Sequence, residues 1–277
     1  GSMRTIVPSS QTSLPASASS AGEDLGDDLC FLIGFPRSGT TLLDVMLDGH
    51  HQVLSVEEKP TMERVAFRLD RLPGHYPLAM NNLTADNRSE LRGLYRQQLA
   101  ELRGPRHTLV IDKMPIRTIH AAFIHRLFPN AKFLFAERHP CDVVLSNFMQ
   151  NYAINEAMIH FTRIDSAVET YDRIMRLWQR TLETLPELPV HSVRYEKLLE
   201  DPEATLRAAC GFLGLPWQSG LQEHREGLAQ RGSIKTNSYH QVAEPLYQRS
   251  KYRWQNYREH LQPHLPILQY HIERMGY

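Results

Sequence analysis

A glycine-containing loop between an apolar run and a helical pattern is the first feature of this chain that could do chemistry. Residues 34–41 read GFPRSGTT and directly follow the apolar run 30–34. Strand–loop–helix junctions of this kind direct backbone N–H groups and the positive end of a helix toward an anion. The spacing fits the phosphate-loop pattern G-x-x-x-x-G-K-[ST], except that Thr40 replaces the lysine. The loop therefore predicts a site for the 5′ end of a nucleotide, without the lysine and Mg²⁺ of triphosphate chemistry.

A second candidate anion site follows the apolar run 131–136. Arg138 comes directly after this run in the segment ERHPCD (137–142), and Ser146 follows eight residues later in a helical pattern. An arginine can hold a phosphate through two parallel hydrogen bonds. The alternative is a structural ion pair of Arg138 with Glu137 or Asp142. Because the carboxyl ends of parallel strands share one edge of a sheet, we expect Arg138 near the loop 34–41.

Strands that alternate with helices are the elements that must position these residues. Buried strands are predicted for 30–34, 108–112, 131–136 and 190–194, and helices for 41–49, 116–127, 141–151, 165–185 and 202–213. This alternation predicts an α/β fold of the P-loop nucleotide-binding type, with a central parallel sheet flanked by helices on both faces.

Composition limits the classes of partner. The 277 residues carry 31 basic and 31 acidic side chains, which argues against a broadly basic nucleic-acid-binding surface. No apolar stretch approaches the ~20 residues of a membrane span, and no basic-then-apolar leader is present. The three cysteines suggest neither a disulfide framework nor a metal site. We therefore expect a cytoplasmic protein without a nucleic-acid partner, a membrane span or a metal.

The N-terminal segment differs in composition from the rest of the chain. Residues 1–28 begin with Gly-Ser-Met, typical of a tag remnant, and continue with a serine-, alanine- and proline-rich stretch. Such a stretch cannot bury enough apolar surface to order itself. We predict a disordered linker over 1–28, of the kind that follows an upstream module, and one folded domain over 29–277.

Taken together, PRSGTTL (36–42) and RHPxDxxxS (138–146) resemble the two donor-binding signatures of sulfotransferases. Further matching stretches in the same order are MLDGHHQVLSVEE (46–58), DKMP (112–115), SVRYEKLLEDPE (192–203) and SYHQVAEPLY (238–247). The chain from 29 to about 262 resembles bacterial sulfotransferases associated with tetratricopeptide repeats and, more distantly, tyrosylprotein sulfotransferases. The resemblance implies 3′-phosphoadenosine 5′-phosphosulfate (PAPS) as the donor and adenosine 3′,5′-bisphosphate (PAP) as the product, with no metal.

The resemblance also assigns the donor-binding residues. It implies that the loop residues hold the 5′-phosphosulfate, that the second signature holds the 3′-phosphate, and that later residues complete the donor site. The residues implied for the 5′-phosphosulfate are Arg37, Ser38, Gly39, Thr40 and Thr41. Those implied for the 3′-phosphate are Arg138 and Ser146, and those implied to complete the donor site are Tyr195, Tyr247, Ser250 and Arg253.

A carboxylate is the expected general base. The resemblance implies that Glu58 takes the proton of the attacking hydroxyl, a role for which a carboxylate within hydrogen-bond reach is suited. Glu57 is the alternative within the same pair, and a solvated acidic pair is the structural alternative for both. His50 and His51 are further candidates, because some sulfotransferases use a histidine; their place at a helix end favours capping or packing.

Two more residues are implied to act on the leaving group. Lys113 matches a lysine directed at the departing phosphate oxygen, and its structural alternative is an ion pair with Asp112; Ser238 matches an assisting serine. The resemblance implies a hydroxyl acceptor, which can belong to a small molecule, an acyl chain or a peptide tyrosine, and we expect residues 59–107 and 152–164 to bound its site. The rival functions are a small-molecule kinase with a P-loop and a nucleotide-binding module without catalysis.

Overall fold

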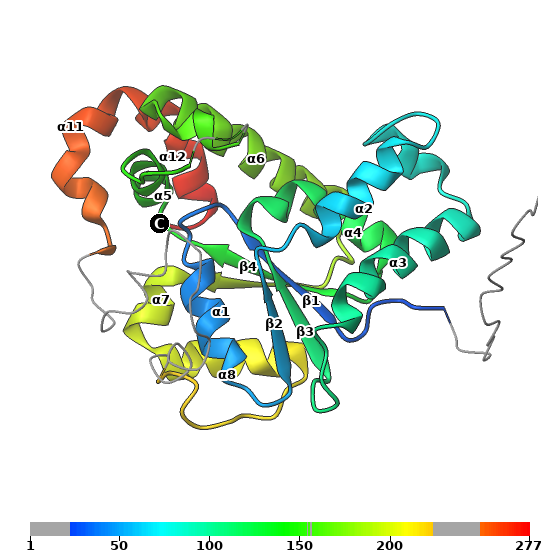
Figure 1. Cartoon of the computed structure of the whole chain (residues 1–277). Coiled ribbons are helices and arrows are strands. Elements are labelled where there is room, and N and C mark those ends of the chain that lie inside the picture. Colours follow the sequence, from blue (N-terminus) through cyan, green and yellow to red (C-terminus); the bar gives the residue numbers. More distant parts are fainter. Residues whose placement is uncertain (1–22, 154, 156, 224–249) are drawn as a thin grey trace, which may run out of the picture.

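The computed structural model describes residues 23–153, 155, 157–223 and 250–277. At its centre lies a sheet of five strands in the order β2-β3-β1-β4-β5, and all neighbouring strands are parallel. The strands are β1 (Leu29–Gly34), β2 (Val53–Glu57), β3 (Leu109–Lys113), β4 (Lys132–Glu137) and β5 (Val190–Arg194). The predicted α/β architecture is confirmed (Figure 1).

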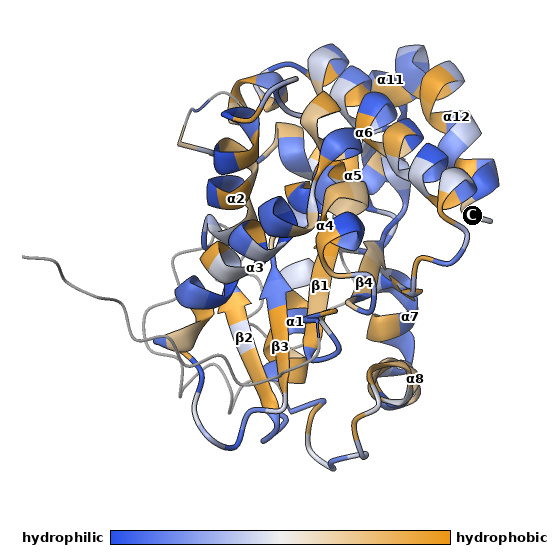
Figure 2. Ribbon diagram, turned by 90° about the vertical axis from the view of Figure 1, so that its right-hand side faces the viewer, coloured by the Kyte–Doolittle hydropathy of each residue, from blue (hydrophilic) through white to orange (hydrophobic). Residues whose placement is uncertain are grey.

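The central strand β1 explains why both faces of the sheet are covered. Leu29, Phe31 and Ile33 belong to one buried cluster, whereas Cys30 and Leu32 belong to another. This division follows from the alternation of side chains along a strand. Since all six residues of β1 are buried, helices must pack on both sides, and Figure 2 shows the apolar strands enclosed by helices with mixed faces.

The helices form two layers. The layer below the sheet in Figure 1 contains α1 (Thr40–Asp48), α7 (Tyr195–Glu200) and α8 (Pro202–Leu213). The layer above it contains α2 (Thr61–Asp70), α3 (Ala85–Ala100), α4 (Ala121–Leu127), α5 (Pro140–Phe148), α6 (Ile164–Thr184) and α12 (Leu265–Arg274). Shorter pieces are η1 (Leu78–Asn82), η2 (Pro115–His120), η3 (Met158–Phe161), η5 (Arg253–Tyr257), α11 (Arg258–Leu261) and η6 (Gln262–His264).

Most predicted elements are present, with some differences. The four predicted strands occur within one residue of their expected limits, but β2 was not predicted, since it is an edge strand with only two buried apolar residues, Val53 and Val56. The helix expected over 116–127 divides into η2 and α4. Pro115 begins η2, in which the Arg117 N–H donates to the Met114 carbonyl at 3.0 Å. The helices α2 and α3 were not predicted either.

The last residues of the expected linker lie against the domain. Arg96 of α3 forms ion pairs with Asp24 and Asp28 at 2.7 and 2.6 Å, and the Asn130 N–H donates to the Leu25 carbonyl at 2.9 Å. The packed chain therefore begins before residue 29. Residues 1–22 lie outside the described part of the chain. Across the described ranges, none of the helices combines the length and apolar character that crossing a bilayer requires.

Candidate functional site

The loop after β1 turns tightly into α1. Gly39 precedes the helix with φ 99°, and Arg37 has φ 71°, so both adopt left-handed conformations. A Cβ placed on Gly39 would lie 2.5 Å from Cδ2 of Tyr195, which leaves room only for glycine. Within the described ranges, no side chain caps the first turn of α1. Its N–H groups are therefore available to an anion, as at other helix N-termini.

Hydroxyl side chains surround these N–H groups. Ser38, Thr40 and Thr41 are all buried within the loop and the first turn of α1. The hydroxyl oxygen of Ser38 has no hydrogen-bond partner among the described residues, although it is fully enclosed. Buried polar groups are normally paired, so this hydroxyl is suited to a ligand atom. The five predicted loop residues thus form one continuous cradle.

The second predicted anion site adjoins the first. Arg37 Nε donates to Ser146 Oγ at 3.1 Å, and Arg138 Nη1 donates to the Arg37 carbonyl at 3.0 Å. Arg138 Nη2 donates to the Ser250 carbonyl at 2.6 Å, and its guanidinium carbon lies 4.7 Å from the ring centre of Tyr195. The Tyr195 hydroxyl is 2.8 Å from Ser250 Oγ. The fold therefore brings together five residues that are far apart in sequence.

Arg138 has no carboxylate partner in the described part of the chain. Its hydrogen bonds go to two carbonyls rather than to Glu137 or Asp142, and its buried Nε has no partner there. Asp142 instead accepts the Trp254 N–H at 2.8 Å. Burial raises the pKa of Asp142, because the nearby guanidinium offsets only part of the loss of hydration. The structural ion pair considered for Arg138 is thus not formed.

Of the predicted residues Arg253, Ser238 and Tyr247, the structure describes only Arg253, and it is not part of this cluster. Arg253 is exposed at the start of η5, with its guanidinium carbon 5.8 Å from the ring centre of Tyr257. Ser238 and Tyr247 lie outside the described residues, so their predicted roles remain predictions.

An acidic pair and a lysine meet where β2 and β3 end. Glu57 pairs in register with Lys113, whose Nζ lies 2.9 Å from Glu57 Oε1 and 2.8 Å from Glu58 Oε1. Burial opposes the charged form of Lys113, but the carboxylates of Asp44, Glu58 and Glu57 outweigh it and raise the pKa of Lys113. Lys113 therefore remains an ammonium group. The alternative pair with Asp112 does not form, since Asp112 bonds elsewhere.

The structure distinguishes the candidate bases by position. Glu58 has a side chain 36% exposed and lines a pocket, whereas Glu57 does not contribute to that pocket. His50 lies just beyond α1, where its Nε2 is 3.0 Å from the Pro216 carbonyl oxygen. His51 stacks on His50. Neither histidine lines the pocket, and both act in packing.

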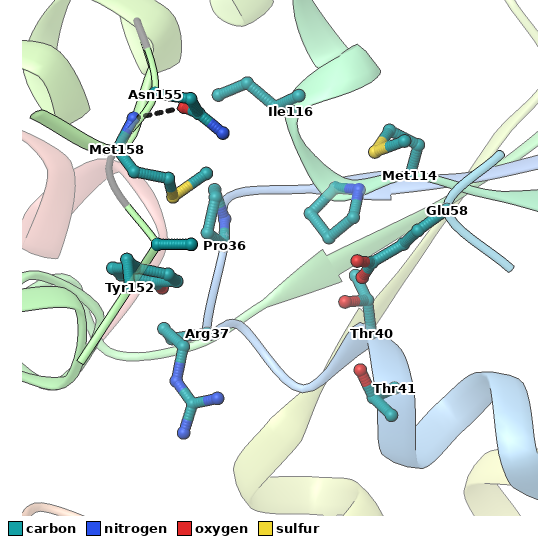
Figure 3. A pocket seen from close by; sticks show the side chains of 12 residues that line it. Pro36, Arg37, Thr40, Thr41, Glu58, Met114, Ile116, Tyr152, Asn155 and Met158 are labelled. Atoms are coloured by element: carbon teal, nitrogen blue, oxygen red, sulfur yellow. Dashed lines mark hydrogen bonds between the residues drawn. The ribbon is translucent and has the colours of Figure 1, made fainter. Parts of the chain in front are cut away.

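This pocket has a volume of about 250 Å³ and opens beside the loop (Figure 3). Its polar end is formed by Arg37, Thr40, Thr41 and Glu58, and Asn155 is a further polar group. Its apolar walls are Pro36, Met114, Pro115, Ile116, Tyr152, Ala153 and Met158. Of the two stretches expected around the acceptor, 152–164 contributes to these walls and 59–107 does not. Residues 114–116 were missed, although they directly follow Lys113 at the carboxyl end of β3.

One wall of the pocket is attached to the loop through a buried amide. The Tyr152 hydroxyl donates to Asn147 Oδ1, and Asn147 Nδ2 donates to the Pro36 carbonyl, both at 2.8 Å. Burial raises the pKa of Tyr152 to about 12, so its hydroxyl stays a donor. Asn147 was not predicted, although it follows Ser146 in α5. Among the described residues, no cluster of three or more His, Cys, Asp or Glu could hold a metal ion.

Comparisons of sequence show the family of this chain. A family model described as "Sulfotransferase family" matches residues 30–219. An uncharacterized protein of Aquifex aeolicus is 27% identical over 250 residues, covering 86% of this chain and 32% of that protein. A protein-tyrosine sulfotransferase of Drosophila melanogaster is 26% identical over 245 residues, covering 82% of this chain and 46% of that protein. The chain thus spans less than half the length of either relative.

Comparisons of structure agree with the fold. A sulfotransferase domain from the curacin biosynthetic pathway superimposes with a TM-score of 0.58 at 23% identity, covering 84% of this chain and 92% of that domain. The sulfotransferase domain of the olefin synthase of Synechococcus PCC 7002 has a TM-score of 0.58 at 22% identity, covering 86% of this chain and 90% of that domain. These likenesses show a shared fold.

Proposed function

Since the chain belongs to the sulfotransferase family by its match over residues 30–219, we propose that it transfers a sulfuryl group from PAPS to a hydroxyl acceptor. The observation that carries the proposal is the position of the Glu58–Lys113 pair. This pair lies at the carboxyl ends of the parallel strands, where the two candidate anion sites also lie. Glu58 and Arg37 line the same pocket. Family membership supports sulfuryl transfer in general; the donor, the base and the acceptor are our proposals.

The two cradles match the two charged ends of PAPS. The loop 37–41 and the N-terminus of α1 would hold the 5′-phosphosulfate, whose negative charge suits the positive end of that helix. Arg138 and Ser146 would hold the 3′-phosphate, with Tyr195 and Ser250 beside them. The unpartnered Ser38 hydroxyl and Arg138 Nε would gain partners from the nucleotide. PAP would remain after transfer, because both phosphates stay with it.

The transfer itself would be an in-line displacement without a metal. The acceptor oxygen attacks sulfur, its proton passes to the Glu58 carboxylate, and the bond from sulfur to the bridging phosphate oxygen breaks with its electron pair on PAP. Among the described residues, Lys113 donates two of its three N–H groups to Glu57 and Glu58, and the third is proposed to serve the leaving oxygen. A fixed ammonium aimed at developing charge lowers the barrier. Ser238 is proposed to assist on the strength of the family resemblance.

The pocket walls indicate which acceptors suit the site. Among the described residues beyond the loop and Glu58, the lining is apolar except for Asn155. Burying further hydroxyls or charges against these walls would leave polar groups unpaired, which is costly. We therefore propose an acceptor whose reacting hydroxyl joins an apolar body, as in a phenol, a peptide tyrosine or a hydroxyacyl chain.

The test is an acceptor panel with ³⁵S-labelled PAPS. The panel contains 4-nitrophenol, a tyrosine peptide, a 3-hydroxyacyl thioester and a hexose, and products are identified by the added mass of one SO₃ group. We expect labelled product from the first three classes in preference to the hexose. Tight binding of MgATP with weak binding of PAP would instead favour a kinase. PAP binding without transfer to any acceptor would leave a nucleotide-binding module.

A further inference from the structure

The backbone of Glu58 has a conformation that its surroundings must maintain. Its φ is 47°, in the left-handed region that residues with a side chain rarely adopt. Such a conformation persists only where neighbouring contacts determine it. On the N-terminal side, the Glu58 N–H donates to the Lys113 carbonyl at 2.8 Å, which continues the pairing of β2 with β3. The turn also needs a fixed point after Glu58.

Arg117 of η2 supplies that fixed point. Its guanidinium is fully buried, and Nη2 donates to the Lys59 carbonyl at 2.9 Å. Nε and Nη2 also donate to the Glu63 carboxylate at 3.2 and 2.9 Å, and Nη1 lies 2.5 Å from Asp112 Oδ1. One buried side chain therefore ties the residue after Glu58 to the end of β3 and the first turn of α2.

Asp112 connects the Arg117 guanidinium to α2 and α3. It accepts the Thr61 hydroxyl at 2.7 Å and the Tyr95 hydroxyl at 2.9 Å, in a fully buried position. Neither Asp112 nor Arg117 lines the pocket. Any effect of this network on the reaction is therefore indirect, and the turn that carries Glu58 is the part of the site that Arg117 contacts through the Lys59 carbonyl.

The same short helix also holds the donor loop. Thr118, the next residue of η2, donates through its hydroxyl to the Gly34 carbonyl at 2.6 Å and accepts the Gly34 N–H at 3.0 Å. Consecutive residues of η2 thus hold the start of the loop and the turn after Glu58. A buried ion pair is weak evidence for stability, since apolar residues often stabilise as much. The geometry of the Arg117 ion pair, which joins η2 to the turn after Glu58, is the stronger reason for its presence.

We infer that Arg117 is a positioning residue, which holds Glu58 in its left-handed conformation and so aims the carboxylate into the pocket. The inference rests on the proposed role of Glu58 in sulfuryl transfer. The guanidinium is required because its planar set of donors reaches the Lys59 carbonyl and the Glu63 carboxylate at once, while its charge pairs with Asp112. Lysine carries the charge without that geometry.

Crystal structures of the Arg117→Lys and Arg117→Gln variants with PAP test the positional claim without any turnover. We expect residue 58 to leave the left-handed region and its carboxylate to leave the pocket, while PAP stays in place. A residue 58 unchanged in both variants overturns the inference. If these variants do not fold, Glu63→Gln is used instead, because it weakens the hold on the Arg117 guanidinium at a partly exposed partner. Movement of residue 58 then supports the inference, and an unchanged residue 58 overturns it.

Kinetics with the best acceptor of the panel give a second readout. We expect Arg117→Lys to lower kcat about 10- to 100-fold, the scale of a misplaced catalytic group, with little change in the Kd of PAP. When Arg117→Lys is combined with Glu58→Gln, kcat should be no lower than in Glu58→Gln alone. Equal losses in both backgrounds overturn the inference, whereas full activity of Glu58→Gln overturns the base assignment itself.

Arg92→Lys is the matched control. Arg92 of α3 is likewise buried, donates to the Leu127 carbonyl at 2.5 Å and pairs with a carboxylate, Glu23. None of these partners belongs to the site. We expect this variant to unfold more easily with kcat unchanged, and a loss of kcat equal to that of Arg117→Lys would contradict positioning by Arg117.

Discussion

Lys113 Nζ lies 2.8 Å from Glu58 Oε1, so the proposed base and the proposed leaving-group cation are in direct contact. The ammonium is shared, because Glu57 Oε1 lies 2.9 Å from the same atom. Only Glu58 also reaches the pocket. The two adjacent glutamates are therefore expected to differ in function, although each pairs with the same lysine.

Replacing each glutamate by glutamine separates their roles. We expect Glu58→Gln to lower kcat about 10²- to 10⁴-fold, the usual contribution of a general base, because an amide cannot take the acceptor proton. The Kd of PAP should be retained. Glu57→Gln, the matched control, removes one partner of Lys113 and should cost less. Labelled-donor kinetics and calorimetry measure both, and equal losses in the two variants would count against Glu58 as the base.

Arg138→Ala tests the 3′-phosphate site. We expect the Kd of PAP to rise about 10- to 100-fold, since hydrogen bonds to charged groups contribute about 1.5–3 kcal/mol. The Kd of AMP, which lacks the 3′-phosphate, should change little. Arg138→Lys keeps the charge without the planar donor pair and should lie between these results. If calorimetry shows equal losses for PAP and AMP, Arg138 does not contact the 3′-phosphate.

Gly39→Ala tests the tight turn into α1. The left-handed φ costs an alanine about 1–2 kcal/mol, and its Cβ would also collide with the Tyr195 ring. We expect a lower free energy of unfolding in urea and weaker PAP binding. Gly93→Ala is the control, because that helical position has open space around it. There alanine should stabilise by about 0.5–1 kcal/mol, and a similar loss in both variants would contradict the turn argument.

His139 predicts a loss of stability in acid. Burial, assisted by the Arg138 charge, lowers the pKa of His139 to about 4. An unfolded histidine titrates near pH 6.5, so from about pH 6.5 down to about 4 the unfolded chain binds more protons and the free energy of unfolding falls. The contribution is at most about 3 kcal/mol. His139→Asn keeps a side-chain acceptor for the Cys141 N–H but does not titrate. Urea unfolding across this range should show a shallower slope for the variant, and an unchanged slope would exclude His139 as a source.

The elements that could be predicted are those with strong local signals. β1 and β4 are continuous apolar runs that end in glycine-containing or charged turns, so their type and limits follow from neighbouring residues. β2 lacks that signal because it lies at the sheet edge and buries few side chains. The short helix after β3 is joined to the donor loop by the bond of Thr118 to Gly34, 84 positions away, which no local pattern contains.

The same distinction applies to the site. The loop residues and Arg138 were identifiable singly, because each follows a strand at its carboxyl end. The contact of Arg37 with Ser146 spans 109 positions, and the hold of Arg117 on the Lys59 carbonyl spans 58. The wall formed by Met114, Ile116 and Tyr152 depends equally on the packing of separate elements.

The sequence by itself determined four of the five strands of the sheet and the short stretches that carry the candidate anion-binding and acidic groups, since hydrophobic spacing and turn chemistry act over a few residues. The tertiary structure alone decided which of two adjacent glutamates faces the pocket and which carboxylates hold Lys113. It also decided that a buried guanidinium maintains the left-handed turn. These outcomes depend on backbone direction and on contacts between distant strands, which arise only when helices pack on both faces of the sheet.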